Sequence, residues 1–260
     1  MGHNKSIVLI KLGGSVITNK SKEYTARPDV ITRLAKEIKK ANVSVVIAHG
    51  SGSFGHTSAT KYGGKKGYKS TWGVAKVARD AMEINRIVMD ILIEEKIPAI
   101  SMRPMSMIIA KKGEVEKNLF ENISLLLKQG ITPVVYGDVI LDTNWKTTIF
   151  SGETTLDLIG LYLLKNDFKI VKNIQVGITD GVYDENKKTI PEITKKNYRQ
   201  YESSIFKSKN TDVTGGMRHK IESSLVLAEK KIPTYIINGL IKNNLYKILV
   251  NKNIECTIIK

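Results

Sequence analysis

Glycine-rich segments of this chain have the residue types and the spacing of phosphate-binding loops. Gly13-Gly14-Ser15 follows the apolar run 7–12, and Gly50-Ser51-Gly52 follows the apolar run 43–48. Backbone N–H groups between a strand and a helix suit phosphate oxygens, and an open parallel sheet brings such loops to one edge. A third pair, Gly215-Gly216, opens a later helical stretch. The spacing therefore predicts a phosphate-binding edge of a sheet.

The glycine patterns alone do not separate ligand binding from turn formation. No loop matches the Walker A pattern, and Gly50–Gly55 ends one residue short of the dinucleotide-binding pattern. Each loop, taken singly, fits a tight turn with positive φ equally well. Two cations favour phosphate binding. Lys11 interrupts an apolar strand, and Lys220 lies in a first helical turn, where a cation opposes the helix dipole unless an anion compensates it.

The elements that position these loops alternate between strand and helix. Continuous apolar runs predict buried strands at 7–12, 43–48, 99–101 and 131–136, and a helical period begins at Pro28. This alternation predicts right-handed β-α-β units with a parallel sheet. The remaining pattern predicts helices at 71–96, 117–129, 151–165, 217–231 and 241–249, a hairpin within 105–116, and strands at 168–178, 233–237 and 254–259. The polar stretch 184–214 is expected to be irregular, as a lid or a boundary between halves.

The composition is that of a folded protein with an excess of positive charge. The 260 residues include 41 Lys+Arg and 25 Asp+Glu, a formal net charge of +16. Seven of these cations are arginines, and aromatic residues make up 7%, which disfavours nucleic-acid binding. The single cysteine, Cys256, excludes an internal disulfide and fits a reducing cytoplasm. No apolar stretch approaches the length of a membrane span. We therefore expect a cytoplasmic protein that binds small anions, with no nucleic-acid or membrane partner.

Six segments occur along the chain in a characteristic order: Lys11–Thr18, His49–His56, Tyr136–Asp138, Ser151–Glu153, Asp180–Tyr183 and Asp212–Met217. Together they resemble the amino acid kinase superfamily and, within it, the isopentenyl phosphate kinases, and the resemblance covers essentially the whole chain. It implies a single domain over 1–260, built as a three-layer α/β/α sandwich with an open, mainly parallel central sheet. Within this domain it implies an acceptor-phosphate half over about 1–165 and a nucleotide-binding half over about 166–260. It also implies that two copies of the chain form a homodimer.

The resemblance implies transfer of a phosphoryl group from ATP, with Mg²⁺, to isopentenyl phosphate in an archaeal-type mevalonate pathway. Lys11 would contact the transferring phosphate, and Glu153 would orient that lysine. Lys20 and Lys220 would reach the nucleotide phosphates. The other residues that the resemblance places on the nucleotide side are Gly13, Gly14, Ser15, Asp180, Tyr183, Gly215 and Gly216.

On the acceptor side, the resemblance implies that His56 hydrogen-bonds the acceptor phosphate. The loop residues that would surround this phosphate are Gly50, Ser51, Gly52, Gly55 and Gly152. No general base is required, because the acceptor is already an oxyanion, and no side chain is expected to ligate a metal. Ser51 and Glu153 depart from the family pattern, which usually has glycine and aspartate at these two positions.

Several interpretations stay open at the level of sequence. Asp138 fits a turn aspartate and a catalytic residue equally well, whereas His49 is expected to be a structural hydrogen-bonder and His219 an exposed helix residue. The apolar face formed by Val74, Val77, Ala78, Ala81 and Met82 fits core packing better than a pocket for a hydrocarbon tail. For the whole chain, the alternatives are a kinase of the same fold acting on a fosfomycin-like phosphonate or an amino acid, and a non-catalytic protein that binds nucleotides or oxyanions.

Overall fold

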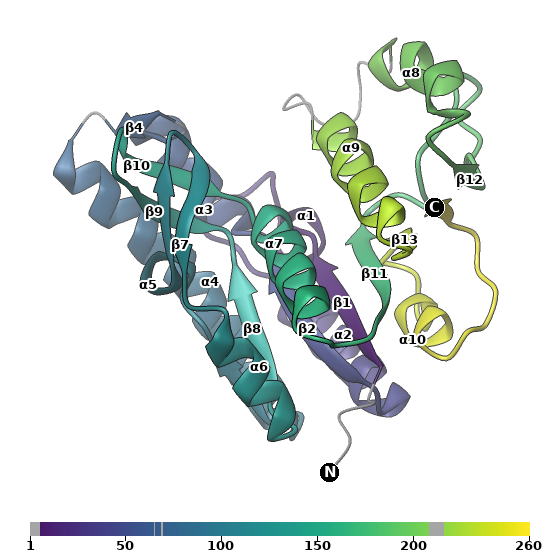
Figure 1. The fold of residues 1–260 in the computed structure, drawn as a ribbon, viewed down its shortest axis with the longest axis horizontal. Coiled ribbons are helices and arrows are strands. Elements are labelled where there is room, and N and C mark those ends of the chain that lie inside the picture. The colour runs from purple at the N-terminus through teal and green to yellow at the C-terminus, as the bar shows by residue number, and fades with distance from the viewer. Residues whose placement is uncertain (1–5, 65, 69, 208–215) are drawn as a thin grey trace.

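The computed structural model describes residues 6–64, 66–68, 70–207 and 216–260. Strands and helices alternate along most of the chain (Figure 1). In chain order the elements are β1 (Ile7–Leu12), α1 (Gly14–Ile17), α2 (Pro28–Ala41), β2 (Ser44–His49), α3 (Gly52–Tyr62), β3 (Gly63–Gly64), β4 (Gly67–Tyr68), α4 (Thr71–Glu94), β5 (Ala99–Ser101), α5 (Pro104–Met107), β6 (Ile108–Lys111), β7 (Glu114–Asn118), α6 (Glu121–Lys128), β8 (Thr132–Tyr136), β9 (Asp138–Asp142), β10 (Lys146–Phe150), α7 (Gly152–Lys165), β11 (Ile170–Gly177), β12 (Glu192–Ile193), α8 (Tyr198–Lys207), α9 (Gly216–Glu229), β13 (Thr234–Asn238), α10 (Asn244–Leu249) and β14 (Thr257–Ile259).

The central sheet has eight strands in the order β12-β14-β13-β11-β1-β2-β8-β5. Neighbouring strands are parallel throughout, except for the antiparallel pair β13 and β14. Helices lie on both faces of this sheet, with α7 crossing in front of β1 and β2 in Figure 1. The predicted α/β/α sandwich with an open, mainly parallel sheet is confirmed.

Strand β1 shows how the continuous apolar pattern follows from burial on two faces. Val8 and Ile10 pack in a cluster with side chains of α2, α4 and α10, whereas Ile7 and Leu9 pack in another cluster with side chains of α7. Successive side chains of a strand point to opposite faces, so both sets must be apolar. Lys11 falls on the face of Ile7 and Leu9, which is the face covered by α7.

A smaller four-stranded sheet, in the order β10-β9-β6-β7, stands beside the central sheet. The predicted hairpin is confirmed as β6 and β7, with its turn at Lys112-Gly113. A second hairpin, β9 and β10, was not expected, because polar residues interrupt its apolar pattern. The two turns are joined by Asp142, whose carboxylate accepts the backbone N–H groups of Gly113 at 2.8 Å and Trp145 at 2.7 Å.

The structure corrects several predicted bounds and one predicted region. The helix expected at 241–249 begins only at Asn244, and the strand expected at 254–259 begins only at Thr257. The helix expected at 117–129 begins only at Glu121, because residues 117–118 extend β7. The stretch 184–214, expected to be irregular, contains β12 and α8. Tyr198 and Tyr201 of α8 pack against a cluster that includes Ile221, a tertiary contact that the polar composition does not reveal. The end of that stretch, 208–215, lies outside the described residues.

Within the described ranges, no helix combines the length and the apolar character needed to cross a membrane.

Candidate active site

A cavity of about 630 Å³ opens at the carboxyl ends of β1 and β2, beside the first turns of α7 and α9. Ligands of open α/β sheets bind at this edge. The cavity brings together most of the residues that the sequence singled out. Those that line it are Lys11, Gly13, Gly14, Ser15, Lys20, Gly50, Ser51, Gly52, Gly55, His56, Gly152, Glu153 and Lys220.

The glycine loops meet backbone to backbone at the wall of this cavity. A Cβ on Gly14 would lie 2.7 Å from the backbone N and Cα of Gly52, which itself has a φ of +51°. A Cβ on Gly152 would lie 2.3 Å from the carbonyl oxygen of His49. The His49 side chain is buried, with Nε2 3.2 Å from Oδ1 of Asn85, so this histidine is a structural hydrogen-bonder. Glycine is therefore required by close approach at these positions.

Lys11 and Glu153 meet between the glycine loops. The Lys11 Nζ lies 3.5 Å from Oε2 of Glu153, and the two side chains are 16% and 8% exposed. Lys11 comes from the end of β1, and Glu153 comes from the first turn of α7, where Ser151 caps the helix by accepting the N–H of Thr154. A largely buried ammonium group needs an anionic partner, and this carboxylate provides one at the cavity wall.

Two basic side chains of α9 also approach Glu153. His219 Nδ1 lies 4.0 Å from Oε1, which is a charge contact and too long for a hydrogen bond. Burial alone would raise the pKa of Glu153, but His219, Lys11 and Lys220 outweigh it and lower that pKa. The same contact raises the pKa of His219. Glu153 is therefore a carboxylate around which three basic side chains are arranged.

Asp157 lies one helical turn after Glu153 on α7. Its Oδ1 is buried, with no hydrogen-bond partner among the described residues. Burial, together with the nearby charge of Glu153, raises the pKa of Asp157 to about 7, although Ser223 and His219 of α9 and Lys11 of β1 oppose the rise. The contact region between α7 and α9 thus contains a second carboxyl group beside Glu153. Unlike Glu153, this group has a raised pKa, close to neutral pH.

The other half of the cavity is apolar and is bordered by α3 and α4. His56 is exposed on α3, and Ala59, Val77 and Ala81 line the wall beside it. Val77 and Ala81 are also buried in core contacts, so they serve as packing residues and as wall residues together. Ile149 of β10 completes this wall.

Asp138 lines the same cavity at the start of β9. Its carboxylate is fully buried, accepts the backbone N–H of Val139 at 2.8 Å, and lies 3.4 Å from Nε of Arg103. Burial raises the pKa of Asp138, and Arg103 opposes that rise. Asp138 is therefore held by its turn and also faces the cavity, so both interpretations of this residue describe part of its environment.

The nucleotide-side residues Asp180 and Tyr183 do not line the cavity. The Tyr183 hydroxyl donates to Oδ2 of Asp180 at 3.2 Å, and Asn238 Nδ2 donates to Oδ1 at 3.2 Å. Gly216 is the first residue of α9, and Gly215 lies outside the described residues. The roles expected of these residues remain predictions.

Sequence reasoning missed three residues of this site. His219 was expected to be an exposed helix residue; its side chain is 65% exposed but contacts Glu153. Gln175 lies in register with Lys11 on the neighbouring strand β11 and lines the cavity. Asp157 received no role. The spacing of Asp157 four residues after Glu153 places both on one helix face, which is a signal that the sequence does contain.

Comparison with known proteins defines the class to which this site belongs. The family model described as "Amino acid kinase family" matches residues 6–238. The chain belongs to the amino acid kinase family.

Within that family, the chain is similar to isopentenyl phosphate kinases. It is 34% identical to the isopentenyl phosphate kinase of Methanothermobacter thermautotrophicus over 96% of this chain and 98% of that protein. It is 31% identical to the one of Methanocaldococcus jannaschii over 95% of this chain and 96% of that protein. A solved structure of isopentenyl phosphate kinase matches 97% of this chain and all of its own length, with a TM-score of 0.81 and 31% identity.

The cavity offers lysine ammonium groups and backbone N–H groups, which are donors for phosphate oxygens, so a magnesium ion there would be held by nucleotide phosphates and water. Among the described residues, no three His, Cys, Asp or Glu side chains gather into a metal site. Mg²⁺ in kinases keeps several water ligands and is held largely by substrate phosphates. When bound, such an ion would neutralise phosphate charge beside Lys11 and Lys220.

Proposed function

We propose that this protein transfers the γ-phosphoryl group of ATP to isopentenyl phosphate and so forms isopentenyl diphosphate and ADP. One observation carries the proposal most directly: a single cavity joins a cationic wall, with Lys11, Lys20 and Lys220, to an apolar wall next to His56. Two phosphate-bearing substrates fit the cationic part, and a short hydrocarbon fits the apolar part. Similarity to isopentenyl phosphate kinases over nearly the whole chain supports the same substrate.

Phosphoryl transfer requires positioning and charge stabilisation more than covalent chemistry. Lys11 would stabilise the charge on the transferring phosphoryl group, since its ammonium lies among the glycine loops beside Glu153. Glu153 would hold Lys11 in place and also attract Lys220 and His219 of α9. The acceptor phosphate is an oxyanion, so no side chain has to remove a proton from it.

The acceptor would lie against α3 and α4. The loop Gly50–Gly52 would contact the acceptor phosphate through the backbone, and His56 would donate a hydrogen bond to it. The isopentenyl chain would lie on Ala59, Val77 and Ala81, whose apolar surface is removed from water by such contact. With this arrangement, the acceptor would bind in the half 1–165 and the nucleotide mainly in the half 166–260.

The proposal includes a cytoplasmic homodimer. Strand β5 forms one edge of the central sheet, and its Ile100 is 42% exposed. Ile93 at the end of α4 is 55% exposed. An exposed strand edge with apolar side chains favours pairing with another chain.

The test is an ADP-release assay on the purified protein with MgATP and a panel of acceptors. Isopentenyl phosphate is expected to support turnover with a higher kcat/KM than fosfomycin, glutamate or N-acetylglutamate. Turnover with one of the others alone would replace the proposed acceptor. ATP binding without turnover on any acceptor would favour the non-catalytic alternative.

A His56→Ala variant tests the assignment of the two halves. Losing one charge-assisted hydrogen bond is expected to lower kcat/KM for isopentenyl phosphate about tenfold or more, while the Kd for ATP changes less than twofold. Steady-state kinetics and calorimetric titration with ATP measure the two quantities. Equal losses in both would contradict the placement of His56 on the acceptor side.

A further inference from the structure

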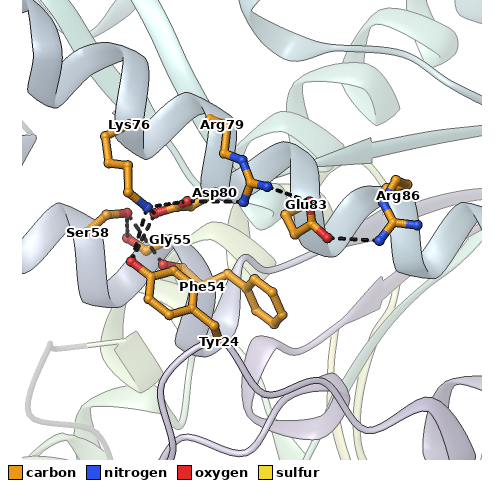
Figure 2. Close-up of polar contacts among 9 residues, drawn as sticks. All are labelled: Tyr24, Phe54, Gly55, Ser58, Lys76, Arg79, Asp80, Glu83 and Arg86. Carbon is orange, nitrogen blue, oxygen red and sulfur yellow. Dashed lines mark hydrogen bonds and ion pairs between the residues drawn. The ribbon is translucent and has the colours of Figure 1, made fainter.

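A buried carboxylate on α4 has no role in the reaction described above. The Asp80 side chain is 0% exposed, and Lys76 Nζ lies 2.6 Å from each of its oxygens (Figure 2). The hydroxyl of Tyr24 donates to Oδ2 at 3.2 Å, and Arg79 lies 3.7 Å from Oδ1. A carboxylate is stable in such a place only when it is paired. Asp80 therefore fixes the positions of the groups that pair with it.

Tyr24 belongs to the loop that carries Lys20. An antiparallel bridge between Thr18 and Ala26 closes this loop over residues 19–25. Lys20 extends from it into the wall of the active-site cavity. Tyr24 has a φ of 49°, a left-handed conformation that a non-glycine residue adopts only when its surroundings hold it there.

The loop is attached to two helices. At α3, the N–H of Thr25 donates to Oγ of Ser53 at 3.2 Å, and the Tyr24 ring packs edge-on against Phe54 at 5.8 Å between ring centroids. At α4, the attachment is the hydrogen bond from the Tyr24 hydroxyl to Asp80, supported by Lys76 Nζ at 3.3 Å from that hydroxyl (Figure 2). The Tyr24 hydroxyl thus joins the Lys20 loop to α4.

Helix α4 is also a wall of the acceptor pocket. Val77 and Ala81, which line the cavity, lie three residues before and one residue after Asp80. A rigid helix thus connects the apolar wall with the loop that supplies a cation to the phosphates. A small displacement of a positioned charged group is enough to slow a transfer step severalfold or more.

We propose that Asp80 is a positioning residue that acts through the Tyr24 hydroxyl to hold Lys20 at the phosphates during transfer. The proposal rests on the proposed function for the chemistry that Lys20 performs. Asp80 itself touches no substrate. Its effect is therefore transmitted through Lys20 and disappears when the Lys20 ammonium is absent.

Tyr24→Phe is the most selective probe, because it removes the hydroxyl and keeps the ring on Phe54. Asp80 keeps Lys76 as a partner in this variant, so the buried carboxylate stays paired. Loss of one hydrogen bond to a charged group is expected to lower kcat about five- to tenfold. KM for isopentenyl phosphate is expected to stay within about twofold, since the pocket wall is unchanged.

A double-mutant cycle with Lys20→Met separates positioning from a general structural effect. In the Lys20→Met background, adding Tyr24→Phe is expected to change kcat less than twofold, because the residue being positioned has lost its charge. The same factor in both backgrounds, or no loss in the wild-type background, would overturn the proposal. Asp80→Asn is expected to follow the same non-additive pattern, with a thermal melt to check folding.

Glu83→Gln provides a matched control on the same helix. Glu83 pairs with Arg79 and Arg86, three residues along α4 from the contact between Asp80 and Tyr24 (Figure 2). The kcat of the Glu83→Gln variant is expected to stay within twofold of that of wild type. A loss as large as that of Tyr24→Phe would show that any change on α4 slows the reaction and would overturn the specific link.

ATP titration of the same variants distinguishes failure of this inference from failure of the proposed function. If the wild type binds ATP without phosphorylating isopentenyl phosphate, the proposed acceptor is wrong, and the inference is judged on the Kd for ATP. A weaker Kd in Tyr24→Phe, absent in the Lys20→Met background, supports the inference. An additive effect, or none, overturns it.

Discussion

One cavity lies at the amino ends of the central strands (the amino edge) and another at their carboxyl ends (the carboxyl edge). The two cavities differ in the residues that line them. At the amino edge, a cavity of about 740 Å³ is lined by residues at the ends of helices and at the beginnings of strands, and Lys39 and Lys96 contribute to this lining. At the carboxyl edge, the cavity of about 630 Å³ has the loops Gly13-Gly14 and Gly50–Gly52 and a lysine paired with Glu153. The two cavities have similar volumes, so the residues that line them, rather than their sizes, distinguish the two edges.

The two edges also differ in the partners of one lysine each, Lys172 on β11 and Lys11 on the neighbouring strand β1. Lys172, near the amino edge, donates to the carbonyl oxygen of Ile248 at 2.6 Å and to Oδ1 of Asn251 at 2.7 Å. Burial lowers the pKa of Lys172. Lys11, at the carboxyl edge, faces Glu153 and an open cavity instead. A lysine whose donors are satisfied by fixed oxygens is structural, whereas one that shares a cavity with a carboxylate can meet a phosphate.

The largest expected effect on kcat comes from replacing Lys11 with methionine, and the same replacement at Lys172 provides the comparison. Lys11→Met is expected to lower kcat about 10²- to 10³-fold, because it removes a positioned charge from the transition state. Lys172→Met is expected to lower the melting temperature and change kcat only a fewfold. Steady-state kinetics and thermal unfolding of both variants provide the check. Similar losses of kcat in both would remove the distinction between the edges.

Gly152→Ala tests the close backbone approach at the carboxyl edge. The new Cβ would lie 2.3 Å from the His49 carbonyl oxygen, and the free energy of unfolding is expected to fall by about 1–3 kcal/mol. Gly177→Ala is the matched control, since its Cβ would meet nothing nearer than 3.8 Å. Urea denaturation measures both variants. Equal stabilities would show that the Gly152 turn relaxes at little cost.

Asp157 makes stability depend on pH at the carboxyl edge. Its pKa of about 7 lies above its ordinary value of 3.8, so between these values the native protein binds more protons than the unfolded chain. Stability contributed through this group therefore falls as pH rises from about 4 to about 7. The Asp157→Asn variant has no carboxyl group to titrate, so it does not lose stability in this way. The free energy of unfolding of the variant, relative to that of wild type, is expected to grow by at least about 1 kcal/mol across that window.

Denaturation of wild type and Asp157→Asn at pH 5 and pH 8 measures that difference. The His219 pKa is also raised, and its contribution, present in both proteins, falls with rising pH in the same direction. A constant difference between wild type and variant at the two pH values would contradict the assignment of the titration to Asp157.

The smallest effect is expected at the amino edge. Replacing Lys39 and Lys96 together with glutamine removes two cations from the amino-edge cavity, yet kcat and KM are expected to stay within about twofold at physiological ionic strength, where exposed charges are screened. ADP release at several ATP concentrations measures this. A marked rise in the KM for ATP would show that the amino edge also binds phosphate.

Local pattern predicted much of this molecule because the relevant forces act over short stretches of chain. The run 7–12 and the glycines after it predicted a buried strand with a ligand loop, since burial on both faces demands a continuous apolar run. The hairpin β9–β10 and helix α8 were not predicted. Polar residues interrupt the apolar pattern of these elements, which also depend on contacts with distant parts of the chain, such as Tyr198 and Tyr201 on the cluster around Ile221.

The candidate site divides in the same way. The motif order predicted which loops gather at one edge, and the cavity contains most of the residues named from sequence. The sequence did not predict which side chains pair with those residues. The approach of His219 to Glu153 depends on how α9 packs beside α7, and the bond between Tyr24 and Asp80 depends on how a loop meets α4. Neither packing angle follows from the spacing of residues within one element.

The amino-acid sequence by itself determined the strand-end glycine loops, the lysine in an apolar strand and the α/β alternation, because each is a property of a few neighbouring residues. The tertiary structure alone decided that Lys11 meets Glu153 while Lys172 is satisfied by a helix end. It also decided that the cationic and apolar walls share one cavity. The physical reason is that burial and charge pairing depend on which distant segments pack together, and that is settled by the whole fold.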